Sequence, residues 1–246
     1  MTVLVIDIGN TSSSIGYYLK DKVSGVGRCV SRFTSSDDVF PLITKKPVDT
    51  VVIASVVPSI NARWKKVIKM AGLPAPIFVD HKLELGISID YPQPEMIGAD
   101  RLANAAAAAK LFGTPSVVCD FGTALTFDVL DGKRGYVGGI ICPGLPLMFD
   151  YLAEKTALLP RVRPVRTKAV VGRNTAQAMQ IGARLGYRGM VREILQALEI
   201  ELGVRRLTIC CTGGYAGWIF KDWEISASID SNFTLKGLGI IGELNT

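Results

Sequence analysis

The sequence predicts a mixed α/β fold made of two halves with similar topology. An apolar run that ends in Asp-x-Gly and a small polar residue occurs twice, at residues 3–11 and 117–124. Asp7 and Asp120 lie 113 positions apart, close to half of the 246 residues. After each motif the pattern of a strand meander gives way to helices alternating with strands, which is typical of α/β proteins. A duplicated unit is the simplest interpretation of this order.

The first half begins with a strand because its apolar run is short and is followed by a Gly-containing turn. Alanine is the best helix former, so the Ala-rich run before Gly113-Thr114-Pro115 predicts a long helix that ends there. We expect strands at 3–8, 13–19, 26–33, 51–56 and 77–79, and helices at 59–71 and 100–112.

The second half repeats the pattern. We expect hairpin strands at 124–129 and 135–141, a strand at 207–211, helices at 146–156, 174–187 and 188–202, and a final turn with a short helix within 235–242. The predicted domains are 1–114 and 115–246. Because no Ser/Gly linker separates them, tight packing with a cleft between the halves is expected. Since Asp-x-Gly is common by chance, two unrelated strand-end turns are the alternative to a repeat.

The composition favours a packed globular protein and argues against a membrane or secreted protein. Hydrophobic residues make up 48% of the chain, which is ordinary for a packed globular protein. No apolar run reaches the roughly 18 residues that suggest a membrane span. The chain starts with a strand-like segment, without the basic start and cleavage site of a secretory signal. We therefore expect a cytoplasmic protein with no membrane partner.

The cysteines and the one histidine argue against several kinds of site. An odd number of cysteines without a Cys-x-x-Cys pair is typical of reduced, buried thiols. A zinc site or a Ser-His or Cys-His catalytic system would have to use His81, so both are disfavoured. The cysteines are Cys29, Cys119, Cys142, Cys210 and Cys211.

A net charge of +6 allows a nucleic-acid interface, but aromatic residues are sparse and no long basic run occurs. Nucleic-acid binding is not expected, and a solvated surface is the simpler explanation for the charged residues. One local basic cluster consists of Arg161, Arg163, Arg166, Lys168 and Arg173.

The two acidic turns carry the predicted chemistry. Each places a carboxylate at the end of a buried strand, followed by a glycine that lets the backbone approach a ligand. Backbone N–H and hydroxyl groups in such a turn can hold phosphate oxygens. Two turns facing each other across a cleft would bind a nucleotide, with Asp7 or Asp120 on its cation. The alternative for each is a local Asx turn, in which the aspartate bonds to its own backbone.

Taken together and in order, the motifs resemble the type III pantothenate kinases, of the superfamily that includes acetate kinase, sugar kinases, heat-shock chaperones and actin. The resemblance covers nearly the whole chain. It is carried by Asp7-Ile8-Gly9-Asn10-Thr11, Tyr91-Pro92 leading to Gly98-Ala99-Asp100-Arg101, Asp120-Phe121-Gly122-Thr123-Ala124, Gly138-Gly139-Ile140 to Pro143-Gly144, Thr156-Ala157-Leu158-Leu159-Pro160, Gly172 to Thr175 with Gln177-Ala178-Met179, and Thr212-Gly213-Gly214.

The resemblance implies two duplicated RNase H-like (actin-like ATPase) domains with mixed sheets flanked by helices and an interdomain cleft. It also implies ATP-dependent phosphorylation of pantothenate to 4′-phosphopantothenate, the first step of coenzyme A biosynthesis, by a homodimer. The implied cofactors are Mg²⁺ and a monovalent cation, K⁺ or NH₄⁺.

The site residues implied by the resemblance fall into groups. Asp100 is the general base, Asp120 holds the monovalent cation, and Asp7 holds magnesium directly or through water. The implied ATP-binding residues are Asp7, Ile8, Gly9, Asn10, Thr11, Ser12, Ser13 and Thr123. The implied substrate-binding residues are Tyr91, Gly98, Ala99, Asp100, Arg101 and Thr175.

Each role has a physical reason and an ordinary alternative. A helix N-terminus lowers the pKa of a carboxylate, which would keep Asp100 ionised, and helix capping is its alternative. Arg101 can bind the pantothenate carboxylate bidentately, or form a surface ion pair. Tyr91 would line the pantothenate pocket, or its side chain would only pack against other residues. Thr175 could equally be an N-cap hydroxyl.

The glycines of the later motifs also have a functional interpretation and an ordinary one. By their positions they would shape the cleft wall or the adenine side of the nucleotide site, or form plain turns. The wall would be formed by Gly138, Gly139 and Gly144, and the adenine side by Gly213 and Gly214.

Two other functions are compatible with the same fold. The first is a kinase acting on another small hydroxylated acceptor, such as a sugar or a carboxylate. The second is a non-catalytic transcription accessory factor. The presence of Asp7, Asp100 and Asp120 argues against the second, because a pure binding module has little need of all three carboxylates.

Overall fold

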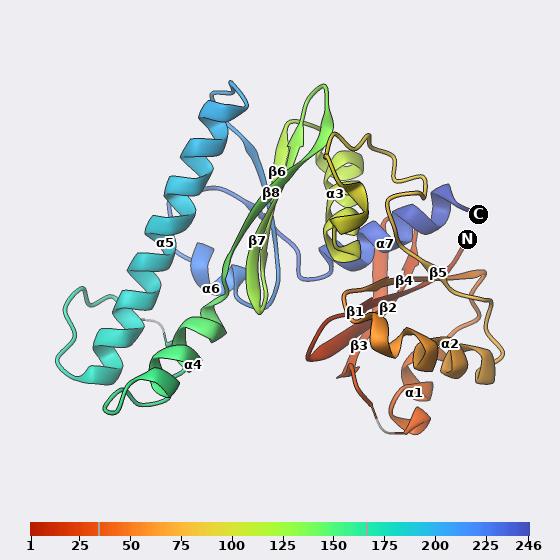
Figure 1. The fold of residues 1–246 in the computed structure, drawn as a ribbon, viewed down its shortest axis with the longest axis horizontal. Helices are drawn as coiled ribbons and strands as arrows, with labels where there is room; N and C mark the ends of the chain where they lie inside the picture. Colours follow the sequence, from red (N-terminus) through yellow and green to blue (C-terminus); the bar gives the residue numbers. More distant parts are fainter. Residues whose placement is uncertain (34, 166) are drawn as a thin grey trace. The chain divides into compact units, whose positions relative to one another are not determined.

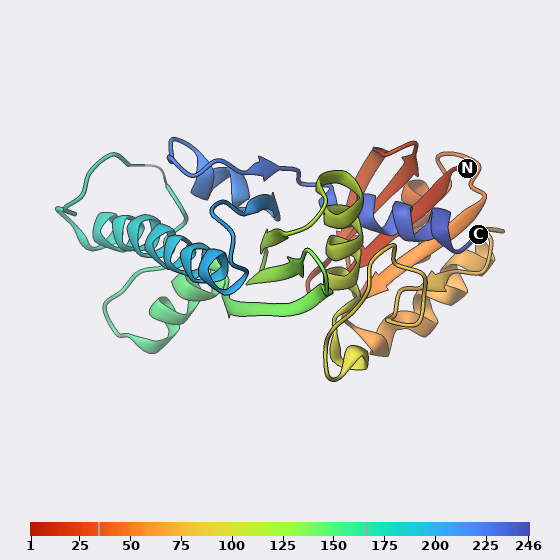
Figure 2. The same ribbon diagram turned by 90° about the horizontal axis from the view of Figure 1, so that it is seen from above.

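The computed structural model describes residues 1–33, 35–165 and 167–246, shown in Figures 1 and 2. The chain divides into two compact units. The first comprises Met1–Thr114, Leu130–Gly138 and Asn232–Thr246, and the second comprises Pro115–Val129 and Gly139–Ser231. The C-terminal residues therefore group with the N-terminal part of the chain, which the division into 1–114 and 115–246 did not anticipate.

The first sheet has five strands in the order β3-β2-β1-β4-β5. Its central strand β1 pairs antiparallel with β2 and parallel with β4, so the predicted opening meander is confirmed. The strands are β1 (Val3–Ile8), β2 (Ser12–Leu19), β3 (Lys22–Val30), β4 (Thr50–Ser55) and β5 (Ile77–Phe78). The third strand starts and ends before the predicted 26–33, because the turn after β2 needs only Lys20 and Asp21, both at positive φ.

One face of this sheet packs on two helices. Leu4, Ile6 and Ile8 alternate along β1 and join a buried cluster with Trp64. The helices are α1 (Phe40–Ile43) and α2 (Asn61–Met70). The short 3₁₀ turns η1 (Ser36–Asp38) and η2 (Pro58–Ile60) precede them, and a third, η3 (Pro94–Met96), follows later in the chain. The helix expected at 59–71 is confirmed as α2.

The opposite face carries α7 (Phe233–Leu244), which also packs on α3 (Ala99–Phe112). A Cβ on Gly242 would lie 3.0 Å from the side chains of Val3 and Val52, so this helix contacts the sheet directly. Figure 1 shows the blue C-terminal helix against the red N-terminal strands. Since side chains alternate along a strand, Asp7 shares this face with Val3 and Val5.

Two glycines of α7 allow this close packing. A Cβ on Gly237 would lie 1.9 Å from the carbonyl oxygen of Ala103 in α3, and one on Gly239 would lie 2.0 Å from the ring of Tyr18. The Ala-rich composition of α3 and the glycines of α7 therefore serve the same purpose: they let two backbones and a sheet approach closely. The Gly-rich tail is a helix of 12 residues, longer than the short helix expected.

Replacing Gly237 by Ala is expected to lower the free energy of unfolding by about 1–3 kcal/mol, because the added methyl group overpacks the α3–α7 contact. Gly189 in α5 is the matched control, since a Cβ there meets nothing within 4 Å. Gly189→Ala should be neutral or stabilising by up to about 1 kcal/mol. Urea unfolding of both variants measures the difference. Equal stability of the two variants would contradict the packing described.

The second sheet repeats the first. Its order is β10-β9-β6-β7-β8, which matches β5-β4-β1-β2-β3 strand for strand. The strands are β6 (Ser116–Phe121), β7 (Ala124–Asp131), β8 (Gly135–Pro143), β9 (Thr208–Thr212) and β10 (Ser228–Ile229). β6 and β9 are parallel, as are β1 and β4. The predicted duplication is confirmed, and Asp7 and Asp120 occupy the fifth position of equivalent strands.

The second unit also contains α4 (Leu145–Lys155), α5 (Thr175–Glu201) and α6 (Ala216–Phe220). The two helices predicted at 174–187 and 188–202 are one helix of 27 residues. The sequence has no proline between them, and Gly182, Gly186 and Gly189 lie on exposed positions where a glycine costs only about 1 kcal/mol. Within the described residues, no helix is long and apolar enough to span a bilayer.

Candidate active site

The first acidic turn joins β1 and β2. The Gly9 N–H donates to the carbonyl of Ser12 at 3.3 Å, and a Cβ on Gly9 would lie 3.0 Å from that oxygen. Asn10, Thr11 and Ser12 are exposed, while Asp7 is half-buried at the end of its strand. The turn thus exposes three polar residues shortly after a carboxylate.

Two predicted ATP-binding residues lie beneath this turn. Ile8 is buried in the core, and Ser13 is fully buried with its hydroxyl 2.9 Å from that of Ser31. The Ser31 hydroxyl donates to the Gly9 carbonyl at 2.6 Å, and its N–H donates to the Thr11 carbonyl. Ser31 therefore fixes the turn from the inside. Sequence reasoning missed it, because no local signal links Ser31 to a glycine 22 positions earlier.

Asp100 lies in the first turn of α3, whose N-cap is Gly98. Its Oδ1 accepts a hydrogen bond from the Arg101 N–H at 2.9 Å, so the carboxylate binds one N–H of the first helical turn although it is not the N-cap. A Cβ at position 98 would lie 2.6 Å from the same oxygen, so glycine leaves room for the carboxylate. Ala99, between them, is buried.

Burial raises the pKa of the Asp100 carboxyl above its ordinary value, against the opposing effects of the Arg101 N–H and guanidinium. The expectation of a lowered pKa is therefore wrong. The helix N-terminus does favour the ionised form, but removing the carboxylate from water disfavours it more strongly. A raised pKa suits a general base, because a more basic carboxylate takes a proton more readily.

Tyr91 and Arg101 both contact a third residue, Tyr136. The Tyr91 and Tyr136 ring centroids are 6.3 Å apart in an edge-to-face arrangement, and the Arg101 guanidinium lies 5.9 Å from the Tyr136 ring centroid. Tyr91 remains 37% exposed, whereas Tyr136 is buried. Gly138 lies under Tyr91, with its φ at +119°, and a Cβ there would lie only 3.3 Å from the ring. The structure therefore brings two of the predicted substrate residues together.

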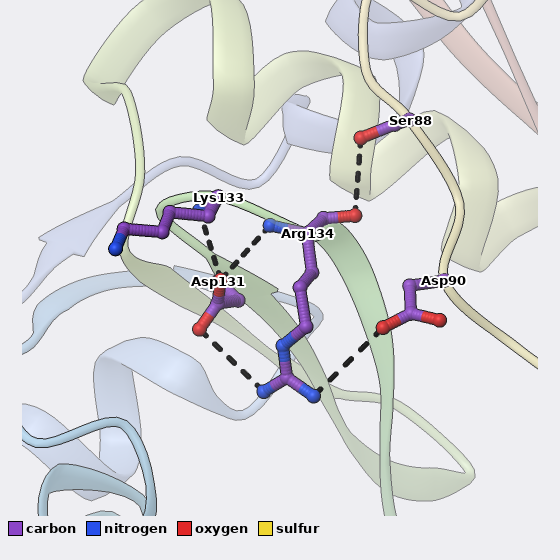
Figure 3. A network of polar contacts seen from close by, with 5 residues as sticks. All are labelled: Ser88, Asp90, Asp131, Lys133 and Arg134. Carbon is purple, nitrogen blue, oxygen red and sulfur yellow. Dashed lines mark hydrogen bonds and ion pairs between the residues drawn. The ribbon is translucent and has the colours of Figure 1, made fainter.

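A polar network anchors the segment before Tyr91, as Figure 3 shows. The Ser88 hydroxyl donates to the Arg134 carbonyl at 3.0 Å, and the Arg134 guanidinium lies 3.8 Å from Asp90 and 3.5 Å from Asp131. The pKa of the Asp131 carboxyl is lowered, chiefly by the backbone N–H groups of Lys133 and Arg134. These contacts fix residues 88–90 beside the start of β8.

A cavity of about 420 Å³ borders the start of α3 within the first unit. Gly98 and Ala99 line it, together with Ser55 at the end of β4. Ser55 is the register partner of Ile8, next to Asp7. The cavity therefore connects the strand ends of the first sheet with the residues that precede Asp100, and its volume is in the range of small-molecule pockets.

The second acidic turn is built like the first. Asp120 is half-buried at the end of β6, and the Gly122 N–H donates to the Ala124 carbonyl at 3.0 Å. A Cβ on Gly213 would lie 2.6 Å from Asp120 Oδ1, so this glycine, at φ +86°, leaves space beside the carboxylate. Thr123 is exposed, and a Cβ on Gly144 would lie 1.9 Å from its carbonyl oxygen.

Thr175 is exposed at the first position of α5. The N-cap is Asn174, whose side chain accepts a hydrogen bond from the Gln177 N–H at 2.8 Å. The Thr175 hydroxyl is thus not the N-cap, which removes the ordinary alternative for this residue. A Cβ on Gly172 would lie 2.5 Å from the Ala178 nitrogen, so the loop packs closely on the helix.

Within the residues that the structure describes, no three or more His, Cys, Asp or Glu side chains gather as a metal site. A magnesium ion on nucleotide phosphates needs only one or two carboxylates, because phosphates and waters supply the other ligands. A single half-buried aspartate at each strand end fits that donor set, and the exposed polar residues of each turn can bind the phosphates.

Comparison with known proteins identifies one family. Residues 3–197 match the family model for type III pantothenate kinase. The type III pantothenate kinase of Akkermansia muciniphila is 42% identical over 247 residues, which cover all of both chains. That of Methylacidiphilum infernorum is 37% identical over 243 residues, covering 98% of this chain and 88% of the relative.

Solved structures of similar fold have low sequence identity. A Campylobacter jejuni protein provisionally described as a Baf family transcriptional activator has a TM-score of 0.59 at 18% identity, with 98% of each chain covered. Component A of (R)-2-hydroxyglutaryl-CoA dehydratase from Acidaminococcus fermentans has a TM-score of 0.51 at 12% identity, with both chains fully covered. These similarities support the duplicated RNase H-like fold, and at such identity they carry no argument about function.

Proposed function

Because the chain belongs to the type III pantothenate kinase family, we propose that it transfers the γ-phosphoryl group of ATP to pantothenate. The product is 4′-phosphopantothenate, the first intermediate on the way to coenzyme A. The observation that carries the proposal is the start of α3, where the half-buried Asp100 carboxylate adjoins an arginine held on an aromatic ring. Full-length similarity to named type III pantothenate kinases supports it.

Asp100 acts as the general base in this proposal. Phosphoryl transfer depends mainly on positioning and charge neutralisation, and the chain must also accept the proton of the attacking hydroxyl. The Asp100 carboxylate has one oxygen bound to the Arg101 N–H, and its raised pKa favours proton uptake. Arg101 would bind the pantothenate carboxylate, and Tyr91 would line the same pocket.

The first acidic turn would hold the phosphates of ATP. Asn10, Thr11 and Ser12 are exposed at the surface of the turn and would bind the phosphates. Gly9, whose N–H is bonded to the Ser12 carbonyl, would let the phosphates approach the backbone. Asp7 would hold Mg²⁺ directly or through water. When bound, the magnesium ion neutralises charge on the phosphates. Ile8 and Ser13 would act through the backbone or by supporting the turn, since their side chains are buried. Thr123 would contact ATP from the second acidic turn.

Asp120 would hold the monovalent cation, K⁺ or NH₄⁺. Replacing Asp120 by Asn is expected to remove activation by K⁺, because the neutral amide loses the charge that attracts the ion. The rate should fall to that of the wild type without K⁺. Steady-state rates measured from 0 to about 200 mM KCl test this, with an inert salt holding the ionic strength constant so that charge screening does not change.

Asp222→Asn is the matched control for that variant. Asp222 is an exposed carboxylate of the same unit at φ +56°, a conformation that Asn also adopts readily. The control should keep the K⁺ response of the wild type. Retention of a normal K⁺ response by Asp120→Asn would exclude Asp120 as the cation ligand.

We also propose a homodimer. The surface between α4 and α5 forms an apolar groove of about 860 Å³, with Leu147 45% and Tyr151 63% exposed. Exposed apolar surface of this kind is typical of interaction sites, and Thr175 begins the same long helix. Light scattering coupled to size-exclusion chromatography should give twice the 26.5 kDa of the chain. A mass of one chain at micromolar concentration would reject the dimer.

An acceptor panel tests the proposed activity against its alternatives. ADP release is measured with MgATP and K⁺ in the presence of pantothenate, simple sugars, small carboxylates or buffer alone. The proposal expects release that depends on pantothenate. Release with another acceptor only would indicate a different small-molecule kinase. Salt-sensitive DNA binding without any ATP turnover would support a transcription accessory factor instead.

A further inference from the structure

We propose that Tyr136 is a positioning residue for substrate recognition, whose ring orients Arg101 and Tyr91 for pantothenate. The proposal deepens the proposed function and rests on it. Neither a sequence motif nor the resemblance to the family singles out Tyr136. Its role follows from the contacts that surround it.

The Tyr136 ring contacts two predicted substrate residues. The Arg101 guanidinium is 5.9 Å from its centroid, which is within the range of a cation–π contact. Tyr91 meets the same ring edge-to-face at 6.3 Å and 64°. One buried aromatic side chain thus contacts two residues that come from separate segments of the chain.

The backbone of Tyr136 is fixed on both sides. Its N–H donates to the Ser88 carbonyl at 2.9 Å, and its carbonyl accepts from the Asp90 N–H at 2.8 Å. Ile89 forms a parallel bridge with Tyr136 itself. The Ser88–Arg134 and Asp90–Arg134 contacts reinforce this pairing (Figure 3). The backbone that carries the ring is therefore held by the same residues that lead to Tyr91.

Glycines next to Tyr136 allow this arrangement. Gly135 has φ +80°, and a Cβ there would lie 2.2 Å from the Ser88 carbonyl oxygen. Gly138 has φ +119°, and a Cβ there would lie 3.3 Å from the Tyr91 ring. Any larger residue would push the 88–91 segment away from β8. The local sequence is thus adapted to hold Tyr91 against Tyr136.

The chemical benefit is preorganisation. An arginine side chain has several rotatable bonds, and ordering them on binding costs affinity. A contact with an aromatic ring restricts the guanidinium before the substrate binds. Because Tyr136 contacts the side chains that would bind the acid, its loss should affect pantothenate binding more than ATP binding.

The test compares three replacements of Tyr136. Tyr136→Met fills similar volume without a ring, and Tyr136→Phe keeps the ring. Pentafluorophenylalanine at position 136 keeps the shape but reverses the charge distribution of the ring face, so it weakens the cation–π contact without disturbing packing. KM for pantothenate, KM for ATP and kcat are measured for each, with thermal unfolding as a check of the fold.

We expect Tyr136→Met and the fluorinated variant to raise KM for pantothenate by roughly 3- to 30-fold, the range of a partly desolvated cation–π contact. KM for ATP should stay within about twofold, and Tyr136→Phe should behave as the wild type. The alcohol analogue of pantothenate, with CH₂OH in place of the carboxylate, should show no such increase, since Arg101 has no anion to bind there. If Tyr136→Met does not fold, the pantothenate KM of the fluorinated variant alone tests the role of Tyr136.

The outcomes separate the inference from the activity on which it rests. A wild-type protein that neither binds nor phosphorylates pantothenate would refute the proposed function. A wild-type protein that is active, together with unchanged pantothenate KM in the fluorinated variant, would refute the role of Tyr136 alone. Equal KM increases for pantothenate, its alcohol analogue and ATP would show that Tyr136 is merely part of the core.

Discussion

Asp100→Asn is expected to lose turnover by about 10²- to 10⁴-fold, the usual contribution of a general base. The amide has the shape of the carboxylate but cannot accept the proton of the attacking hydroxyl. Since Asp7 and the first acidic turn are unchanged, the dissociation constant of MgATP should stay within about threefold. Steady-state ADP release and calorimetric titration of the nucleotide measure the two quantities.

The same substitution should not destabilise the protein. Burial raises the pKa of the Asp100 carboxyl in the folded state above its unfolded value. A group shifted in this direction favours folding when protonated, below the unfolded pKa of about 3.9, and loses that contribution as pH rises through the folded pKa. At neutral pH the Asp100 charge, partly removed from water, opposes folding, so Asn should leave the melting temperature unchanged or raise it.

The pKa shift also predicts the pH dependence of the wild type. A general base must be ionised, so kcat/KM should fall on the acid side at a pH above the value of about 3.9 expected for an exposed aspartate. Near-wild-type activity of Asp100→Asn would show that the base is another group. A marked loss of stability would instead show that the carboxylate is mainly a structural cap.

Asp7→Asn is expected to have the second largest effect. If Asp7 holds the magnesium ion on the phosphates, its loss should weaken metal binding by at least the roughly 10- to 100-fold caused by removing an outer-shell partner. Turnover at about 1 mM Mg²⁺ should fall accordingly, and the midpoint of a Mg²⁺ titration should move to higher concentration. KM for pantothenate should change little.

Asp49→Asn is the control for Asp7→Asn. Asp49 is an exposed carboxylate of the same unit that accepts a hydrogen bond from the Thr2 N–H. Its replacement removes the same charge from the protein without altering either acidic turn, so its Mg²⁺ dependence should match the wild type. An unchanged midpoint of the Mg²⁺ titration in Asp7→Asn would mean that Asp7 only bonds to its own backbone in a local turn.

The duplicated architecture could be predicted from sequence because its signal is local. Each copy has a short apolar strand, an aspartate at the strand end and a glycine in the turn, and β1 and β6 have the same burial pattern. The packing of α7 on α3 and on the first sheet could not be predicted in this way. It depends on Gly237 and Gly239 meeting residues more than a hundred positions earlier.

The sequence proposes the residues of the candidate site but does not predict their environment. The motif around Asp100 indicated a helix N-terminus, but the balance between helix dipole and burial depends on the tertiary structure, so the direction of the pKa shift was missed. Ser31 and Tyr136 were missed for a related reason. Each supports a predicted residue through a contact between segments, and nothing in the spacing of the sequence records such a contact.

The most direct test of the central claim follows the phosphoryl group itself. Phosphorus NMR of the wild-type protein with ATP, Mg²⁺, K⁺ and pantothenate should show the γ-phosphate signal replaced, mole for mole, by one phosphomonoester signal that is absent without pantothenate. Mass spectrometry should assign that signal to 4′-phosphopantothenate. Conversion of ATP to inorganic phosphate alone, or no conversion, would contradict the account.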